Sequence, residues 1–181
     1  MRNKGALSVL LLPVAVILAT VTVALAQTPA DPLISGQKML DARVKDYVIR
    51  SAEKMPEENY SFKPTADVRS FGQILGHIAD AQYAFGSAIL GEKNPEPGIE
   101  KNKTSKADLI QALKEAFAYS DKAYTGLTDA QAGQMVTFYG RQAAKLTILS
   151  MNNAHNSEHY GNLVTYMRMK GLVPPSSEPR K

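Results

Sequence analysis

Four segments of the chain repeat apolar residues at the three- and four-residue spacing of a helix, and this periodicity constrains the fold most strongly. The first segment begins at Asp31, an N-cap acid before a proline, and ends near Met55-Pro56. The second begins at Ser70, which forms a capping-box pattern with the glutamine three positions later, and ends at Gly91. The inward face of the first segment is predicted to comprise Leu33, Leu40, Val44, Tyr47 and Val48.

The two remaining segments lie in the second half of the chain. The third starts at residue 104 or 105 and fades near Gly126, and the fourth begins after Gly140 and continues to Lys170, with Gly171 as its stop signal. No strand pair or internal repeat is recognisable in the sequence, and essentially no sheet is expected. Four amphipathic helices with short-to-medium loops predict an all-α protein, an up-down-type four-helix bundle.

The first 26 residues have the pattern of a signal peptide rather than of a bundle helix. Arg2 and Lys4 form a short positive head, residues 6–26 are mostly apolar, and the sequence Ala-Leu-Ala closes this run in the small-x-small form of a signal-peptidase site. An uncleaved anchor is the alternative, because the run is long enough to span a bilayer. We expect cleavage before Gln27, export to the periplasm and no membrane attachment of the mature chain.

The mature chain would have 181 − 26 = 155 residues, which is enough for one domain with a substantial core. The bundle domain is expected over residues 27–177, followed by a loose tail over 178–181. Without the two basic residues of the signal peptide, 19 Lys and Arg remain against 17 acids, so the net charge falls from +4 to +2. This small imbalance gives no argument for a nucleic-acid partner. The absence of cysteine excludes disulfides, thiolate ligands and a thiolate nucleophile.

The three histidines of the chain are the candidate metal ligands. His155 and His159 are four residues apart, which places them on one face of the fourth segment with Cβ atoms about 5–6 Å apart. His77 lies on the second segment beside the predicted buried face, although a lone histidine in such a position is more often a core residue. Metal sites in bundles are built from side chains of facing helices. The pattern therefore predicts one divalent ion, with zinc, nickel, iron, copper and manganese all compatible with three imidazoles and added waters.

The segment His-Asn-Ser-Glu-His at 155–159 also has the form of the inverted zinc-protease motif, with Glu158 as its base. Those enzymes need a third, acidic ligand on a later helix. Only 22 residues follow His159, and their one acid is Glu178 near the C-terminus. The protease hypothesis therefore fails on length.

Several side chains near the histidines in sequence are candidates to line the site. Asp80 is one helical turn from His77, and Glu158 is one turn from the second ligand, so both are candidates to orient imidazole rings. No catalytic residue is assigned. The further candidates for the lining are Asn152, Asn156, Tyr83 and Tyr160.

Two stretches carry a resemblance to a known family. The segment NYSFKPTADVRSFGQILGHIADAQ at 59–82 contains His77, and the segment HNSEHYGNLVTYMRMKGLVPPSS at 155–177 contains the other two histidines. With the helix order between them, these segments resemble the DinB-like family of four-helix-bundle metalloenzymes over most of residues 31–177. The resemblance implies that His77, His155 and His159 bind a divalent metal ion. Asn162 stands where the family usually has glutamine.

The resemblance also implies a range of activities. Characterised relatives carry out transfer or isomerisation reactions with low-molecular-weight thiols, while many members have no known reaction. We therefore expect a metal-dependent transferase or hydrolase that acts on a small molecule, in a chain able to form a homodimer. The alternatives are a non-catalytic periplasmic bundle that binds metal or a small ligand, and histidines that only pack in the core.

Overall fold

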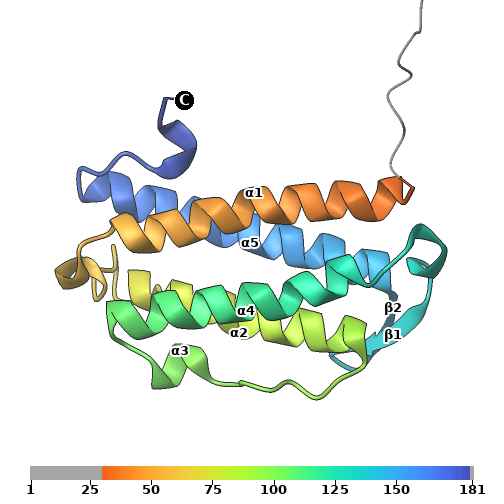
Figure 1. Ribbon diagram of the computed structural model, residues 1–181. Helices are drawn as coiled ribbons and strands as arrows, with labels where there is room; N and C mark the ends of the chain where they lie inside the picture. The colour runs from red at the N-terminus through yellow and green to blue at the C-terminus, as the bar shows by residue number, and fades with distance from the viewer. Residues whose placement is uncertain (1–29, 180–181) are drawn as a thin grey trace, which may run out of the picture.

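The computed structural model describes residues 30–179, so the predicted signal peptide at 1–26 lies outside the described residues. Four long helices lie side by side along one axis (Figure 1). They are accompanied by three short 3-10 helices, η1 (Glu57–Asn59), η2 (Asp129–Gln131) and η3 (Pro175–Ser177). The bundle helices are α1 (Pro32–Lys54), α2 (Phe71–Leu90), α4 (Lys106–Thr125) and α5 (Lys145–Met169), with the short α3 (Ile99–Asn102) between α2 and α4.

The predicted helix limits are mostly confirmed. Ser70 caps α2 with a full capping box, and Gly91 closes the helix in the left-handed conformation with φ of 72°. Asp31 occupies the N-cap position of α1, but its side chain does not cap the helix. The carboxylate of Asp129 in η2 accepts the α1 backbone N–H groups of Leu33 and Ile34 instead.

The up-down order predicted for the bundle is wrong for the pair α2 and α4. The connection of residues 91–105, which contains α3, runs back along the bundle, so α2 and α4 point the same way (Figure 1). Close approaches confirm this direction, because Gly72 lies against Leu109 near the start of both helices and Gly86 lies against Ser120 near their ends. A long connection can join parallel helices as readily as antiparallel ones, and the helical pattern does not distinguish the two.

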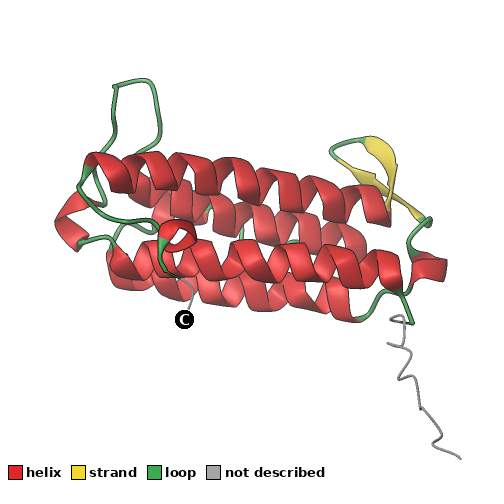
Figure 2. Cartoon of the chain, turned by 90° about the horizontal axis from the view of Figure 1, so that it is seen from above, coloured by secondary structure: helices red, strands yellow, loops and turns green. Residues whose placement is uncertain are grey.

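The expectation of no sheet is also wrong, although the sheet is small. Strands β1 (Met135–Phe138) and β2 (Arg141–Ala144) form an antiparallel hairpin at one end of the bundle (Figure 2). Phe138 pairs with Arg141, so the turn consists of Tyr139 and Gly140 alone, both with positive φ. Four-residue strands are too short for a clear alternating pattern, which is why the sequence did not reveal them.

The inward face of α1 differs from the prediction in its first half. Leu33 and Leu40 are 54% and 44% exposed, while the residues after them, Ile34 and Asp41, are buried. Val48 is buried as predicted. The prediction followed hydrophobicity alone, and the buried aspartate broke the apolar pattern that would have identified the correct face.

The core of the described chain contains two apolar clusters with a polar layer between them. One cluster is centred on residues such as Phe71, Leu75 and Phe117, and the other on Phe85 and Ile148. The polar layer consists of buried side chains from all four long helices, namely Asp41, Gln82, Ser120, Asn152 and Asn156.

The chain beyond α5 is held against α1 rather than loose. Glu178 forms ion pairs with Arg50 and Lys54 of α1. The last two positions of the predicted tail, 180–181, lie outside the described residues. Over the described range, none of the helices combines the length and apolar character required to cross a membrane.

Candidate metal centre

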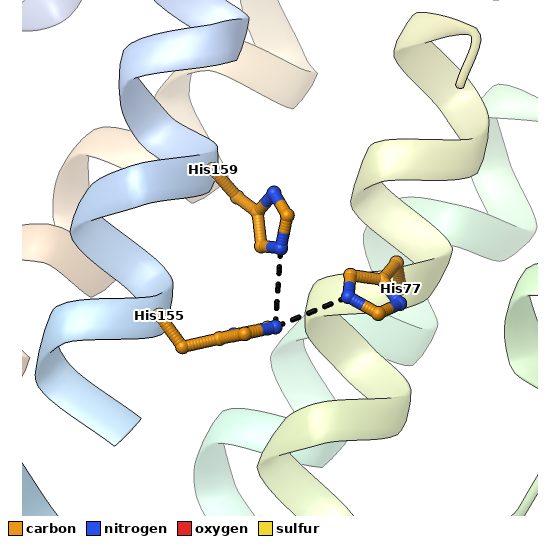
Figure 3. A group of neighbouring side chains, drawn as sticks. All are labelled: His77, His155 and His159. Atoms are coloured by element: carbon orange, nitrogen blue, oxygen red, sulfur yellow. Dashed lines mark hydrogen bonds between the residues drawn. The ribbon is translucent and has the colours of Figure 1, made fainter. Parts of the chain in front are cut away.

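The three histidines come together between α2 and α5. His77 lies near the middle of α2, and His155 and His159 lie on successive turns of α5 and point toward it (Figure 3). The Nε2 atom of His155 lies 3.1 Å from Nε2 of His77 and 3.1 Å from Nε2 of His159. One nitrogen from each residue lies within 4.8 Å of the others, a spacing at which a single ion can contact all three.

Two of the imidazole rings also contact a neighbouring side chain through Nδ1, the ring nitrogen that does not take part in the contacts between the histidines. Nδ1 of His77 lies 3.1 Å from a carboxylate oxygen of Glu100 in α3. Because a carboxylate only accepts, Nδ1 must carry the proton, and Nε2 then offers its lone pair toward the other histidines. Nδ1 of His159 lies 3.3 Å from the side-chain amide of Asn162. The amide oxygen can take the same position by rotation about the side chain, and it would then accept a hydrogen bond from Nδ1–H of His159.

The close contacts between Nε2 atoms in the histidine triad cannot all be hydrogen bonds. A neutral imidazole nitrogen presents either one proton or one lone pair in the ring plane. Nε2 of His155 has two Nε2 neighbours and can form a hydrogen bond with only one of them. Its own Nδ1 is buried and has no hydrogen-bond partner among residues 30–179. A cation bound by three lone pairs would remove this conflict, so the donor set fits a metal ion.

The surroundings favour the neutral form of His155 and His159. Burial lowers the pKa of His159 to about 4, with further lowering by His155 and His77. Burial also lowers the pKa of His155, followed by the effect of His77. Histidines with such low pKa values are unprotonated at pH 7, which is the form that binds metal ions.

Two hollows open beside the triad. The first has a volume of about 290 Å³ and is lined by His77 and His155 together with Phe85 and Tyr139. The second has a volume of about 300 Å³ and is lined by His159 and by charged side chains. Both are at the lower limit of the range for small-molecule sites. The charged residues that line the second hollow are Asp67, Arg69 and Glu158.

Neither acid predicted to orient the histidines does so. The carboxylate of Asp80 accepts the backbone N–H groups of Gly98, Ile99 and Glu100, and so caps the N-terminus of α3. Glu158 is exposed at the rim of the second hollow. The carboxylate that does contact a ligand comes from Glu100, and Asp80 supports it indirectly by holding α3.

The other lining candidates lie beside the site rather than in it. Asn152 and Asn156 are buried in a cluster with Gln82, deeper between the same two helices. The ring of Tyr83 packs against a tyrosine of α4, and that of Tyr160 stacks on a tyrosine of α1. All four residues therefore serve the packing of the bundle.

Sequence reasoning missed two residues of the site, Glu100 and Tyr139. Glu100 belongs to a four-residue helix in a connection without apolar periodicity. Its backbone can lie close to α2 because residue 76 is a glycine, where an added Cβ would lie 2.7 Å from the Cα of Glu100. A glycine one position before a candidate ligand was the available signal. Tyr139 lies in the hairpin turn that was not predicted.

Comparison with known proteins places these observations in a family. The family model described as the DinB superfamily matches residues 41–163. An uncharacterised protein of Bacillus subtilis (strain 168), YjoA, is 27% identical over 123 residues, which cover 66% of this chain and 79% of that protein.

Three solved structures show the same fold. A DinB-like protein of Bacillus cereus has a TM-score of 0.70 at 19% identity, covering 78% of this chain and 95% of its own. YjoA has a TM-score of 0.62 at 22% identity, covering 79% and 99%. A mutant of mycothiol-dependent maleylpyruvate isomerase has a TM-score of 0.57 at 15% identity, covering 72% and 60%.

Proposed function

The chain belongs to the DinB superfamily, and we propose that it binds one divalent metal ion through His77, His155 and His159 and uses it to act on a small molecule. The reaction class that we propose is metal-dependent transfer or hydrolysis. The observation that carries the proposal is the convergence of three Nε2 atoms whose contacts cannot all be hydrogen bonds. Three imidazoles leave coordination positions open, which is typical of catalytic rather than structural sites.

The residues around the triad support a reactive site. When bound, a divalent ion supplies Lewis acidity and lowers the pKa of a coordinated group. Glu100 orients the ring of His77, and Asn162 lies against the outer nitrogen of His159. The hollow beside His77 and His155 offers space for a small substrate. One structure with the same fold is named as a mycothiol-dependent isomerase, which supports an enzymatic role for the bundle.

A second candidate is a non-catalytic bundle that sequesters a metal ion or a small ligand. One observation favours it. The one carboxylate that lines the first hollow belongs to Asp80, and that carboxylate is engaged by three backbone N–H groups of the α3 region. The first hollow therefore offers no carboxylate free to transfer protons.

Elemental analysis of the purified protein tests the metal site. We expect about one zinc, nickel, iron, copper or manganese ion per chain in the wild type and a large loss in His77→Ala. An equal metal content in both proteins would contradict the assignment. A substrate screen on the metal-loaded protein then separates the enzyme from the binding bundle.

Export to the periplasm is a further part of the proposal. It is supported by the positive head at Arg2 and Lys4, the apolar run and the Ala-Leu-Ala pattern before Gln27. Intact-mass measurement of protein produced with its native N-terminus is expected to give a chain that begins at Gln27. Recovery of the full-length chain in the membrane fraction would support an anchor instead.

A further inference from the structure

Tyr139 occupies a backbone position that a tyrosine does not favour. It is the first residue of the two-residue hairpin turn, with φ of 45°, and Gly140 follows with φ of 74°. Turns of this kind need positive φ at both positions, and asparagine, aspartate or glycine are the usual residues at the first. Tyr139 is the one non-glycine residue among the described positions with positive φ. A bulky side chain in this region strains the backbone.

The strain at Tyr139 is not offset by packing in the core. The residue is 81% exposed, and its hydroxyl group makes no hydrogen bond within residues 30–179. Its ring contacts that of Phe138, with 4.3 Å between centroids. Strained residues that do not stabilise the fold gather at ligand sites. The position of Tyr139 therefore points to a role in binding.

The hairpin brings this ring to the histidines. Phe138 is buried and stacks on Phe85 of α2, with centroids 4.8 Å apart, and Phe85 lies 5.8 Å from the ring of His155. This anchored strand places Tyr139 at the rim of the 290 Å³ hollow that His77 and His155 also line. The hollow thus has metal-ligating nitrogens at one part of its wall and an exposed aromatic ring at its rim.

The lining of the hollow indicates the kind of ligand. Its apolar wall is formed by Ala81, Ala84, Phe85 and Pro97. The Asp80 carboxylate already accepts three backbone N–H groups, and the Asn94 side-chain oxygen accepts the backbone N–H group of Glu96. Apart from the histidines and Tyr139, the amide nitrogen of Asn94 is therefore the polar side-chain group of the wall that is left for a ligand. An aromatic ring at the rim contributes most when it stacks on another flat group.

We infer that Tyr139 is a specificity-determining residue, which stacks on the planar, largely apolar part of a small ligand whose donor atom faces the histidine triad. This inference rests on the proposed metal site and adds the substrate class to it. The ligand that fits is a small aromatic or otherwise planar molecule with a single coordinating group.

Calorimetric titration with two probes tests the inference. Imidazole carries the donor alone, and 4-phenylimidazole carries the donor with a planar apolar group. On the zinc-loaded protein, 4-phenylimidazole is expected to bind at least about tenfold more tightly than imidazole. In Tyr139→Asn, the affinity for 4-phenylimidazole should fall about three- to tenfold and that for imidazole should not change. Tyr139→Phe should behave as the wild type.

Thermal melts separate this role from a structural one. Asparagine suits the turn better than tyrosine, so the melting temperature of Tyr139→Asn is expected to hold or rise. Met135→Ala is the matched control, because Met135 is an exposed apolar residue of the same hairpin that does not line the hollow. It should leave both probe affinities unchanged. A clear fall in the melting temperature of Tyr139→Asn would make the residue structural and overturn the inference.

The same titrations on metal-free protein distinguish a failure of the proposed metal site from a failure of the inference about Tyr139. If none of zinc, nickel, iron, copper and manganese binds, the proposed metal site is wrong. The role of Tyr139 then stands only if Tyr139→Asn still weakens the binding of 4-phenylimidazole to the metal-free protein. If zinc and imidazole bind but the phenyl group adds no affinity, or Tyr139→Asn changes neither affinity, the inference fails while the metal site stands.

Discussion

Two polar clusters lie along the interface of α2 and α5, and they differ in whether the hydrogen-bond donors and acceptors within each cluster match. In the amide cluster, Gln82 donates to the side-chain oxygens of Asn152 and Asn156, at 3.1 and 2.7 Å, and Asn152 donates back to Gln82 at 3.1 Å. Donors and acceptors match, as buried polar groups require. In the histidine triad, three Nε2 atoms face each other without matching protons.

This difference separates a structural cluster from a binding site. The amide cluster is buried, complete within the chain and placed between the two apolar clusters of the core. Satisfied networks of this kind rigidify a bundle and specify how its helices pair. The triad is less buried, lies beside two hollows and has nitrogen contacts that cannot all be hydrogen bonds. Of the two clusters, the triad is the one whose donor set could hold a metal ion.

The largest effect is expected when the amide cluster is broken. Gln82→Met keeps the side-chain volume but removes three buried amide hydrogen bonds and leaves the side-chain oxygen of Asn156 without its donor, so the free energy of unfolding should fall by about 2–4 kcal/mol. Metal affinity should stay within a factor of about two. Urea denaturation measures the first quantity, and Gln111→Met, at an exposed glutamine of α4, is the control. A loss below about 0.5 kcal/mol would show that the cluster is not structural.

The next largest effect is expected on zinc affinity, when the carboxylate of Glu100 that contacts His77 is removed. Removing the contact from Glu100 to Nδ1 of His77 is expected to weaken zinc binding by about 10- to 100-fold in Glu100→Ala. Glu100→Gln keeps an acceptor oxygen and should lose less. Competition titration with a chelator measures both affinities. Glu96→Ala, at an exposed acid of the same connection, should bind zinc as the wild type does, and an equal loss there would remove the specific role of Glu100.

The two clusters should also differ in their response to pH. The pKa of His159 falls from 6.5 to about 4 on folding, so the unfolded chain binds more protons between these values. The stability of the metal-free protein therefore decreases as the pH falls from about 6.5 toward 4, by up to about 1.4 kcal/mol per pH unit for this residue. His159→Asn should remove this part of the slope in urea denaturation at several pH values, whereas Gln82→Met should retain it. An identical slope in wild type and His159→Asn would contradict the buried, neutral histidine.

A pH effect of the opposite sign is expected at Asp41, whose buried carboxylate forms a hydrogen bond with Tyr124 beside the amide cluster. Burial and then the charge of Asp121 raise the pKa of Asp41 from 3.8 to about 6. The folded chain then binds the proton more tightly, so stability is lost as the pH rises from about 4 to 6. Asp41→Asn carries no charge, so its stability relative to wild type should rise by about 2–3 kcal/mol between pH 4 and pH 8, at about 1.4 kcal/mol for each unit of the pKa shift. Thermal melts at both values measure this, and an equal gain at both would point to packing instead.

Much of the candidate metal site could be predicted from the sequence. The four-residue spacing of His155 and His159 determines that both lie on one face of a helix. His77 stands next to Ile78 on an apolar stripe, so its helix must turn that side toward the bundle interior. Local periodicity was therefore enough to bring the three ligands together, and the structure confirms that they meet.

The remaining features depend on contacts that local patterns do not encode. The parallel course of α2 and α4 requires the 91–105 connection to run back along the bundle, and the Asp80 carboxylate holds α3 within that connection. Glu100 reaches His77 only because α3 is held there. The buried Asp41 misled the assignment of the α1 face, since a charged residue is rarely expected in a core.

Thermal stability with and without metal tests the central claim most directly. His77 and the pair on α5 meet only in the folded chain, so an ion that binds all three should stabilise the wild type by about 2.7 kcal/mol at a hundredfold excess over its Kd. For a domain of this length, the melting temperature should rise by about 5–10 °C relative to protein in chelator. His155→Ala should lose this rise, while Gln82→Met should melt lower but keep it. If zinc, nickel, iron, copper and manganese all leave the wild-type midpoint unchanged, the triad is a packing cluster and the proposed metal-dependent function is wrong.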